Sequence, residues 1–488
     1  MNNRIVSGVF WRFGEKITAQ LVSFIVSVVL ARILLPEDYG VVAIVNVFIA
    51  IAEIFVTSGL GTALIQKQNA DELDFSTVFW VNITFSLLLY MVFFFLAPVI
   101  ADFYKMPILV NVLRFFGIRL PISAFNSIQN AYVSRNMDFK KFFFATILGT
   151  IISAVAGVIL ALKGFGVYSL VIQTLTNATI DTIVLFTVID WHPQFKFSFD
   201  RAKPLVSYGW KILATDFIGT AFNHINAFII GKKYSSGDLA YYTQGKKLPD
   251  LINNNVGTTL SAVLFPAMAL TGDKKQIKEI RRKSLQMLEF VMFPLMFGLI
   301  AVSDTLVVVL FTEKWLDIIP FIRIAAIDAI FGVLGTTLVQ EIKAIGRSDV
   351  ALKNELVKKP VFLVVILLAV PFGVKAIALS AVVNGLLAFG FNVYPVKKYI
   401  GFDIWLHIRD SLPAFFMSLI MCAIVYFLHF CIHNLYVCLV VQIFVGIAVY
   451  ICLSLLTRNK SFFYLEKIFL NKLKYSQNEQ VGKKKNAE

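Results

Sequence analysis

The chain has 488 residues, of which 58% are hydrophobic and 15% charged, and its mean hydropathy is +0.77. Soluble domains carry about 25% charged residues, so the composition excludes an ordinary soluble protein. The apolar runs lack the alternating pattern of a transmembrane β-barrel. We therefore expect an all-α polytopic membrane protein.

Long apolar runs follow one another along the whole chain. A bilayer core about 30 Å thick needs about 20 apolar residues for each crossing helix, and the runs are close to that length. We predict about 14 transmembrane helices, at residues 12–34, 39–62, 76–100, 108–133, 142–162, 166–190, 204–230, 238–267, 285–310, 316–342, 354–371, 373–396, 411–431 and 434–456.

The formal net charge of +15 comes from basic residues that gather in every second loop. One set of alternate loops holds Lys67 alone, then the group Arg135, Lys140 and Lys141, then the six basic residues of 274–283, and eight more follow Leu456, whereas the intervening loops hold few. By the positive-inside rule, this bias predicts that both termini are cytoplasmic. The charge is a topology signal, and we expect no nucleic-acid partner.

The first half of the chain is repeated in the second half. The sequence GEKI at 14–17 returns as GWKI at 209–212, and PEDYG at 36–40 returns as SGDLAY at 236–241. An even number of predicted helices per repeat gives both halves the same orientation, as in transporters built from parallel repeats. We predict a six-helix lobe at 1–190, a cytoplasmic loop at 191–203, a second six-helix lobe at 204–398, two extra helices at 399–456 and a basic cytoplasmic tail at 457–488.

Three motifs carry a resemblance to a known family: LARILLPEDYG at 30–40, RNMDF at 135–139 and YYTQGKKLP at 241–249. With them the chain, to about residue 400, resembles the bacterial Wzx-type flippases of the colanic-acid and teichuronic-acid exporter kind. These belong to the multidrug/oligosaccharidyl-lipid/polysaccharide exporter superfamily. The resemblance implies two lobes facing each other across a central cavity, in the bacterial cytoplasmic (inner) membrane.

The same resemblance implies a substrate and a mechanism. The substrate would be an undecaprenyl-type, pyrophosphate-linked oligosaccharide, moved from the inner to the outer leaflet by alternating access. The sequence leaves open the identity of the sugar and the coupling ion. It also leaves open whether the protein works alone or beside a polysaccharide polymerase and an initiating glycosyltransferase.

Charged side chains within the predicted spans are the candidate site residues, because an ionisable group at membrane depth costs at least about 2.5–3.5 kcal/mol unless it has a partner or faces water. In the fourth span, Arg119 begins a polar stripe, and in the sixth span Gln173, Asn177 and Asp181 recur at helical spacing. Such stripes can also serve only to bond neighbouring helices. For ion coupling we predict Asp216, with Glu53 as the second candidate.

The predicted eighth span is unusually polar. Gly245 and Pro249 weaken its helical ladder, so we predict a broken helix that lines a binding site. The alternative is an external loop, followed by a helix that starts only after Asn255. A pyrophosphate needs cations at membrane depth. We predict Lys211, Lys246, Lys247, Arg119 and, more weakly, Arg323 as its ligands, with Asn253, Asn254 and Tyr242 against the sugars.

Two further features of the second half of the chain, the charged pair Arg323 and Asp328 and the segment 460–475, can each be interpreted in two ways. Arg323 and Asp328 lie five residues apart and could neutralise each other instead of binding a ligand. The alternating aromatic and basic residues of 460–475 predict an interfacial helix on anionic membrane lipid, although a solvated tail is the alternative.

No catalytic constellation is present in the sequence. It contains no phosphate-binding glycine loop and no metal-ligand spacing, and its four cysteines lie in the last two predicted spans. We therefore expect a transporter with no cofactor and no metal, and not an enzyme. Two alternatives remain: a cation-coupled multidrug exporter of the same superfamily, and a membrane polysaccharide polymerase or glycosyltransferase, which would need larger external loops.

Overall fold

The computed structural model describes residues 3–136, 139–271 and 273–467, and the regular secondary structure in these ranges is helical throughout. The chain divides into two compact units, Met1–Thr243 and Gln244–Glu488, which we call the N-terminal unit and the C-terminal unit. The boundary lies inside a helix. The lobe boundaries drawn from the sequence repeat stay a prediction.

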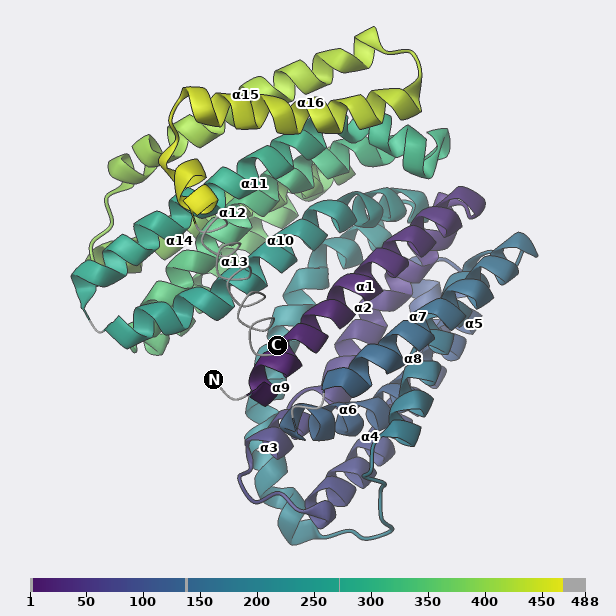
Figure 1. The fold of residues 1–488 in the computed structure, drawn as a ribbon. Helices are drawn as coiled ribbons and strands as arrows, with labels where there is room; N and C mark the ends of the chain where they lie inside the picture. The colour runs from purple at the N-terminus through teal and green to yellow at the C-terminus, as the bar shows by residue number, and fades with distance from the viewer. Residues whose placement is uncertain (1–2, 137–138, 272, 468–488) are drawn as a thin grey trace, which may run out of the picture. The chain divides into compact units, whose positions relative to one another are not determined.

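The N-terminal unit contains nine complete helices in the described residues (Figure 1). They are α1 (Asn3–Ile33), α2 (Pro36–Thr57), α3 (Leu60–Gln66), α4 (Glu72–Tyr104), α5 (Ile108–Gly117), α6 (Arg119–Asn136), α7 (Phe139–Leu162), α8 (Val167–Val188) and α9 (Phe199–Lys233). Helix α10 (Ser236–Thr271) begins in this unit and continues into the next.

The C-terminal unit holds the rest of α10 and six further α-helices in the described residues. They are α11 (Lys274–Phe311), α12 (Ile319–Ala344), α13 (Ser348–Ala369), α14 (Val374–Tyr399), α15 (Ile404–Cys431) and α16 (Leu435–Leu456), with short 3₁₀ turns at Glu313–Ile318 and Val370–Phe372.

The structure confirms a multi-pass membrane protein. Among the residues that the structure describes, eleven helical segments are long and apolar enough to cross a membrane. The other predicted spans fall on α9, α10 and α13, which are helical but carry more charge. Their place in the bilayer, and with it the count of 14, remains a prediction. The eleven are Gly14–Ile33, Pro36–Gln66, Glu72–Tyr104, Ile108–Asn136, Phe139–Leu162, Val167–Val188, Lys274–Phe311, Glu313–Ala344, Val374–Tyr399, Ile404–Cys431 and Leu435–Leu456.

Within the N-terminal unit, α7 packs between α1 and α8, and α2 contacts α6, α8 and α9. The link between α2 and α3 lies against α9 through two glycines. Gly59 has a φ of +87°, and a Cβ built on it would lie 2.5 Å from the carbonyl oxygen of Gly209. A side chain at position 59 would therefore push the two elements apart.

Within the C-terminal unit, α11 is the central helix and packs against α12, α15 and α16 (Figure 1). Phe290, Met296 and Tyr450 are among the buried side chains of this core. The Tyr450 hydroxyl donates a hydrogen bond of 2.8 Å to the Phe290 carbonyl oxygen, which satisfies a polar group that would be costly to bury alone. The two helices after the predicted second lobe are thus part of the same core.

The prediction of a broken eighth span is wrong. Helix α10 runs continuously through Gly245 and Pro249, so the alternative of an external loop before residue 256 is wrong as well. Gly245 serves close packing instead, because a Cβ at this position would lie 2.5 Å from the Cβ of Phe321 on α12. Contact with a neighbouring helix compensates here for weak local helix propensity.

The tail is described only as far as residue 467. Residues 460–467 are helical, and Phe462 and Leu465 pack against the core around α11 and α16. The remainder of the predicted interfacial helix, and the end of the basic tail, lie outside the described residues.

Candidate functional site

A polar cavity of about 430 Å³ lies in the N-terminal unit among α2, α3, α6 and α8. Its wall is made largely of hydroxyl, amide and charged side chains, which is unusual among apolar helices. The polar lining residues are Glu53, Thr57, Thr62, Arg119, Ser123, Asn126, Ser127, Asn130, Ser134, Asn177 and Asp181. The two polar stripes that the sequence predicts on α6 and α8 therefore meet in one cavity.

An ion pair connects α2 with α6 in this cavity. The Arg119 Nε donates to Glu53 Oε1 at 2.7 Å, and the Ser123 hydroxyl donates to the same oxygen at 2.8 Å. The Arg119 and Glu53 side chains are 30% and 20% exposed, so both charges are reachable from the cavity. Two residues that the sequence predicts for different roles, anion binding and ion coupling, are thus direct partners.

Arg119 owes its position to a break in the fourth span. Helix α5 ends at Gly117 and α6 begins at Arg119, which places the guanidinium at the junction. Pro121 falls in the first turn of α6, where a missing backbone N–H costs little. The guanidinium also lies 5.9 Å from the centre of the Phe116 ring, which supports its orientation.

The α6 and α8 walls are joined by amide and hydroxyl groups. Asn130 donates to Asn126, and Asn126 donates to the Thr182 hydroxyl at 3.4 Å. Asp181 Oδ1 is buried and accepts no hydrogen bond from the residues that the structure describes. Gly149 on α7 leaves room for this carboxylate, because a Cβ there would lie 2.0 Å from Asp181 Oδ1.

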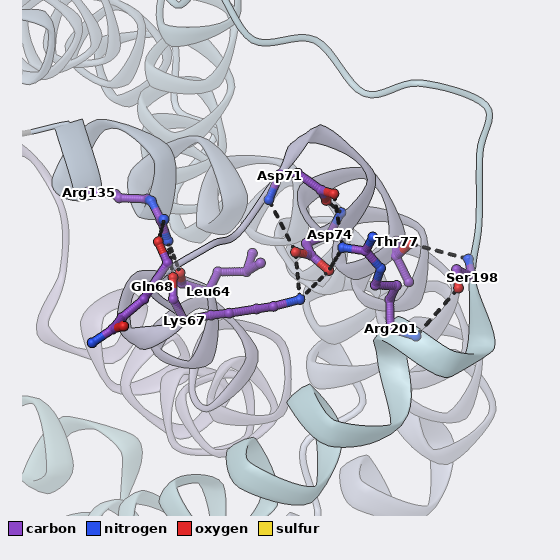
Figure 2. Close-up of polar contacts among 9 residues, drawn as sticks. All are labelled: Leu64, Lys67, Gln68, Asp71, Asp74, Thr77, Arg135, Ser198 and Arg201. Carbon is purple, nitrogen blue, oxygen red and sulfur yellow. Dashed lines mark hydrogen bonds and ion pairs between the residues drawn. The ribbon is translucent and has the colours of Figure 1, made fainter.

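A charge network fixes the end of α3 to α4 and α9 (Figure 2). The Asp74 carboxylate is fully buried and accepts two hydrogen bonds of 2.7 Å from Lys67 and one of 3.3 Å from Arg201. A buried carboxylate requires such cations, since its desolvation costs several kcal/mol. Because α3 forms part of the cavity wall, this network holds that wall in place.

Two further contacts complete the network. The Asp74 backbone N–H and the Arg201 guanidinium hold the pKa of Asp71 below its ordinary value of 3.8. Arg135, at the end of α6, donates to the carbonyl oxygens of Leu64, Lys67 and Gln68 (Figure 2). A helix C-terminus offers unsatisfied carbonyls, and a guanidinium with five donors is suited to satisfy several of them.

The other predicted residues of the N-terminal unit are not in this cavity. Lys211 and Asp216 both lie exposed on α9. Tyr242 is buried, and its hydroxyl accepts a hydrogen bond of 3.2 Å from Asn226. Their roles in substrate binding and ion coupling remain predictions.

In the C-terminal unit, Lys246 is half-buried and Lys247 and Asn254 are exposed, all on α10. Asn253 is half-buried, and a Cβ built on Gly332 of α12 would lie 3.5 Å from its Nδ2. The Asn253 Oδ1 is buried and has no donor among the described residues. The structure therefore places the predicted α10 residues along one helix. Their contact with a substrate stays a prediction.

Arg323 does not pair with Asp328. Its guanidinium donates to the Asp304 carboxylate and, at 3.0 Å, to the Ser303 hydroxyl, both on α11. Sequence reasoning missed Asp304, although an acid inside an apolar run of α11 is itself a signal of a buried partner. Asp181 was part of a predicted stripe, but the sequence did not predict that it shares a cavity with the Glu53–Arg119 pair.

The cavity can bind charge of either sign. Arg119 and the surrounding amide and hydroxyl donors suit a phosphate or a sugar, while Glu53 and Asp181 suit a proton or a small cation. The family to which the sequence belongs helps to choose between these uses.

Residues 29–320 match the family model described as polysaccharide biosynthesis protein, which is more than half of the chain. The chain belongs to this family. It is 25% identical to the succinoglycan biosynthesis transport protein ExoT of Rhizobium meliloti, over 71% of this chain and 70% of that protein. It is 26% identical to the teichuronic acid biosynthesis protein TuaB of Bacillus subtilis (72% and 73% covered) and 21% identical to the lipopolysaccharide biosynthesis protein WzxC of Escherichia coli (86% and 87%).

Solved structures show the same fold. The lipid II flippase MurJ, in an inward closed conformation, matches with a TM-score of 0.77 and 16% identity, over 94% of this chain and 100% of that one. An inward-facing multidrug transporter of the MATE family matches with a TM-score of 0.59 and 14% identity, over 78% and 95% of the two chains. The family resemblance that the sequence motifs indicate is thus confirmed.

Proposed function

We propose that this protein moves polyprenyl-pyrophosphate-linked oligosaccharide repeat units from the inner to the outer leaflet of the bacterial cytoplasmic membrane. Alternating access of two six-helix lobes would carry the substrate, within a topology of 14 spans and cytoplasmic termini. The relatives named above act in the biosynthesis of succinoglycan, teichuronic acid and lipopolysaccharide, and MurJ is a lipid II flippase. Their shared chemistry supports a lipid-linked saccharide as the cargo.

The observation that carries the proposal is the Arg119–Glu53 pair in a cavity rich in amide and hydroxyl groups. A pyrophosphate at membrane depth needs a charge-assisted donor, and a guanidinium can make two parallel bonds to phosphate oxygens. Amides and hydroxyls provide the alternating donors and acceptors that sugar hydroxyls require. One cavity therefore offers groups suited to both parts of the cargo.

In this proposal, Glu53 is the partner of Arg119 while no cargo is bound. Without cargo, an unpaired guanidinium would be costly within a span, and Glu53 removes that cost. An arriving pyrophosphate would replace Glu53 as the partner of Arg119, and the released carboxylate would then favour a proton or Na⁺. We propose this exchange as the ion-coupling step, with Asp216 on α9 as a second carboxylate available to it.

A cation-coupled multidrug exporter is the main alternative within the fold. The acidic side chains of the cavity would suit a cationic drug, and the MATE transporter shares the architecture. The family match and the curated relatives favour the saccharide cargo. A polysaccharide polymerase or glycosyltransferase is less well supported, because the relatives that carry a stated activity are transport proteins and flippases.

The first experiment tests the anion site. Arg119→Ala, Lys211→Ala, Lys246→Ala and Lys247→Ala are compared with the wild type for export of lipid-linked oligosaccharide at equal protein levels. We expect at least two variants to fall by about tenfold or more, since a lost charge-assisted contact is worth about 1.5–3 kcal/mol. Lys163→Ala and Lys375→Ala, which remove exposed lysines near helix ends, serve as controls and should export normally. Normal export by all four test variants would refute the site.

The second experiment tests coupling. Glu53→Gln and Asp216→Asn keep the side-chain shape and remove the charge, so expression and cargo binding should survive. At least one of them should lose the dependence of transport on the ion gradient. Gradient-dependent transport by both variants at the wild-type rate would assign both carboxylates a structural role.

A further inference from the structure

A second polar cavity, of about 560 Å³, lies in the C-terminal unit where α11, α15 and the segment after α16 meet. We call it the α16 cavity. It takes no part in the transport proposal above. Its charged lining residues are Arg282, Lys283, Arg409, Arg458 and Lys460, with the carboxylates Glu279 and Asp410.

Most of the positive charge in this cavity is not neutralised. Arg282 forms a two-pronged ion pair with Asp410, at 2.5 and 2.9 Å. The side chains of Lys283, Arg409, Arg458 and Lys460 are exposed and pair with no carboxylate among the residues that the structure describes. Glu279 alone remains to oppose them, so the cavity has a clear excess of cations and suits a multiply charged anion.

In α11, α15 and α16 with the segment that follows it, charged residues give way to an apolar run beside this cavity. On α11 the basic run ends at Lys283 and the apolar run starts at Leu285, and on α15 Asp410 is followed by Leu412. Helix α16 ends at Leu456, which is 80% exposed, and Arg458 follows. Such a transition on three packed elements marks the level where hydrocarbon meets water, which is where the phosphates of lipid headgroups lie.

Aromatic side chains mark the same level. Phe462 packs against the ring of Phe290 on α11, which holds the segment after α16 beside the cavity. The neighbouring Phe463 and Tyr464 are exposed. Exposed aromatic residues at a span end are typical of the membrane interface, so the apolar surface beside the cavity is suited to acyl chains.

We propose that the α16 cavity binds the phosphate of an anionic phospholipid headgroup. Basic pockets between the ends of transmembrane helices are a recognised form of lipid-binding site. A soluble phosphate ester would satisfy the same cations, but it would not use the apolar and aromatic surface next to them. The bound lipid would join α11, α15 and the segment after α16 at one point.

The test measures lipid binding by the full-length protein in detergent with native mass spectrometry. Phosphatidylglycerol, phosphatidylcholine and inorganic pyrophosphate are titrated separately. We expect phosphatidylglycerol to bind more tightly than phosphatidylcholine. The double variant Arg458→Gln/Lys460→Gln should weaken phosphatidylglycerol binding by about tenfold or more, since each basic residue near the membrane surface contributes to such binding.

The matched control is Lys353→Gln/Lys397→Gln, which removes two exposed lysines of the same unit that do not line the cavity. It should bind phosphatidylglycerol within about twofold of the wild type. A second pair, Lys283→Gln/Arg409→Gln, repeats the test if the first fails to fold. Equal binding by cavity and control variants would overturn the proposal, and pyrophosphate binding as tight as that of phosphatidylglycerol would reassign the cavity to a soluble phosphate. Neither result bears on the cargo.

Discussion

The corresponding helices α2 and α10 begin in the same way but carry different side chains further along. At the start of α2 the backbone N–H of Leu35 donates to Asp38 Oδ2 at 3.2 Å, and at the start of α10 that of Ser235 donates to Asp238 Oδ2 at 3.2 Å. The pairs are 200 residues apart, as the sequence repeat requires. Repeated local geometry supports a common origin of the two helices.

The same register brings Glu53 of α2 into correspondence with Asn253 of α10. Glu53 pairs with Arg119 of α6, whereas Asn253 lies beside Gly332 of α12, and the residues that the structure describes form no ion pair at this position of the second helix pair. The charges of α10, such as Lys246, lie nearer its start. The repeat thus preserved the start of the helix, whereas the charged side chains occupy different positions along α2 and α10. Four predictions test how far this asymmetry extends.

The largest difference in stability is expected between a buried ion pair of the N-terminal unit and an exposed ion pair of the C-terminal unit. Asp74→Asn leaves Lys67 and Arg201 without their buried partner and should lower the free energy of unfolding by about 3 kcal/mol. Asp349→Asn removes an exposed partner of Arg347, where water screens the charges, and should lower the free energy of unfolding far less. Denaturation in mixed micelles measures both. Similar losses would show that burial does not distinguish the two ion pairs.

Helix packing gives the next effect. Gly149→Ala on α7 places a Cβ against Asp181 of α8 and should destabilise the protein by about 1–3 kcal/mol. Gly390→Ala on α14 meets no atom within 4 Å and should be neutral or slightly stabilising through better helix propensity. The same denaturation experiment compares them. A neutral Gly149→Ala would mean that α7 can move away from α8 at little cost.

The N-terminal caps of α10 and α2 should differ by about 1 kcal/mol in their contribution to the free energy of unfolding. Ser235 completes a capping box, because its hydroxyl also accepts from the Asp238 N–H at 3.0 Å, while Leu35 has no such group. Ser235→Ala should therefore lower stability by about 1 kcal/mol, and Leu35→Ser should raise it by about 0.5 kcal/mol. Thermal unfolding of the two variants beside the wild type is sufficient. Opposite signs would show that contacts outside the caps dominate at these positions.

The smallest effect is a response to acid that both units should share. The pKa of Asp71 is lowered by the Asp74 N–H and by Arg201, and that of Asp349 is lowered by Arg347. Each carboxylate then stabilises the folded state above its ordinary pKa of 3.8, and this contribution is lost as the pH falls through the lowered value. Asp71→Asn and Asp349→Asn should each make stability less dependent on pH below about 4. Unchanged pH profiles would show that neither contact stabilises the folded protein.

The sequence was a good guide to features that depend on local composition. Every predicted span falls on described helices, because apolar length determines where a bilayer helix can form. The polar stripes of α6 and α8 were also visible, since side chains four residues apart share a helix face.

Features set by contacts between helices were not predictable in this way. Arg323 finds its acid on α11 and not five residues along its own helix, because side chains at that spacing point apart. Helix α10 continues through Gly245 because α12 packs closely there. The Glu53–Arg119 pair joins residues 66 positions apart, and only the fold brings them together.

The contact between Gly59 and Gly209 has a consequence for how this sequence can vary. Gly209 begins the GWKI motif, and its counterpart in the first copy, Gly14, meets only a Phe143 ring atom at 3.8 Å. After duplication, selection on this glycine would therefore have relaxed in one copy and tightened in the other. Among natural variants we expect larger residues to appear at position 14, while positions 59 and 209 stay small together.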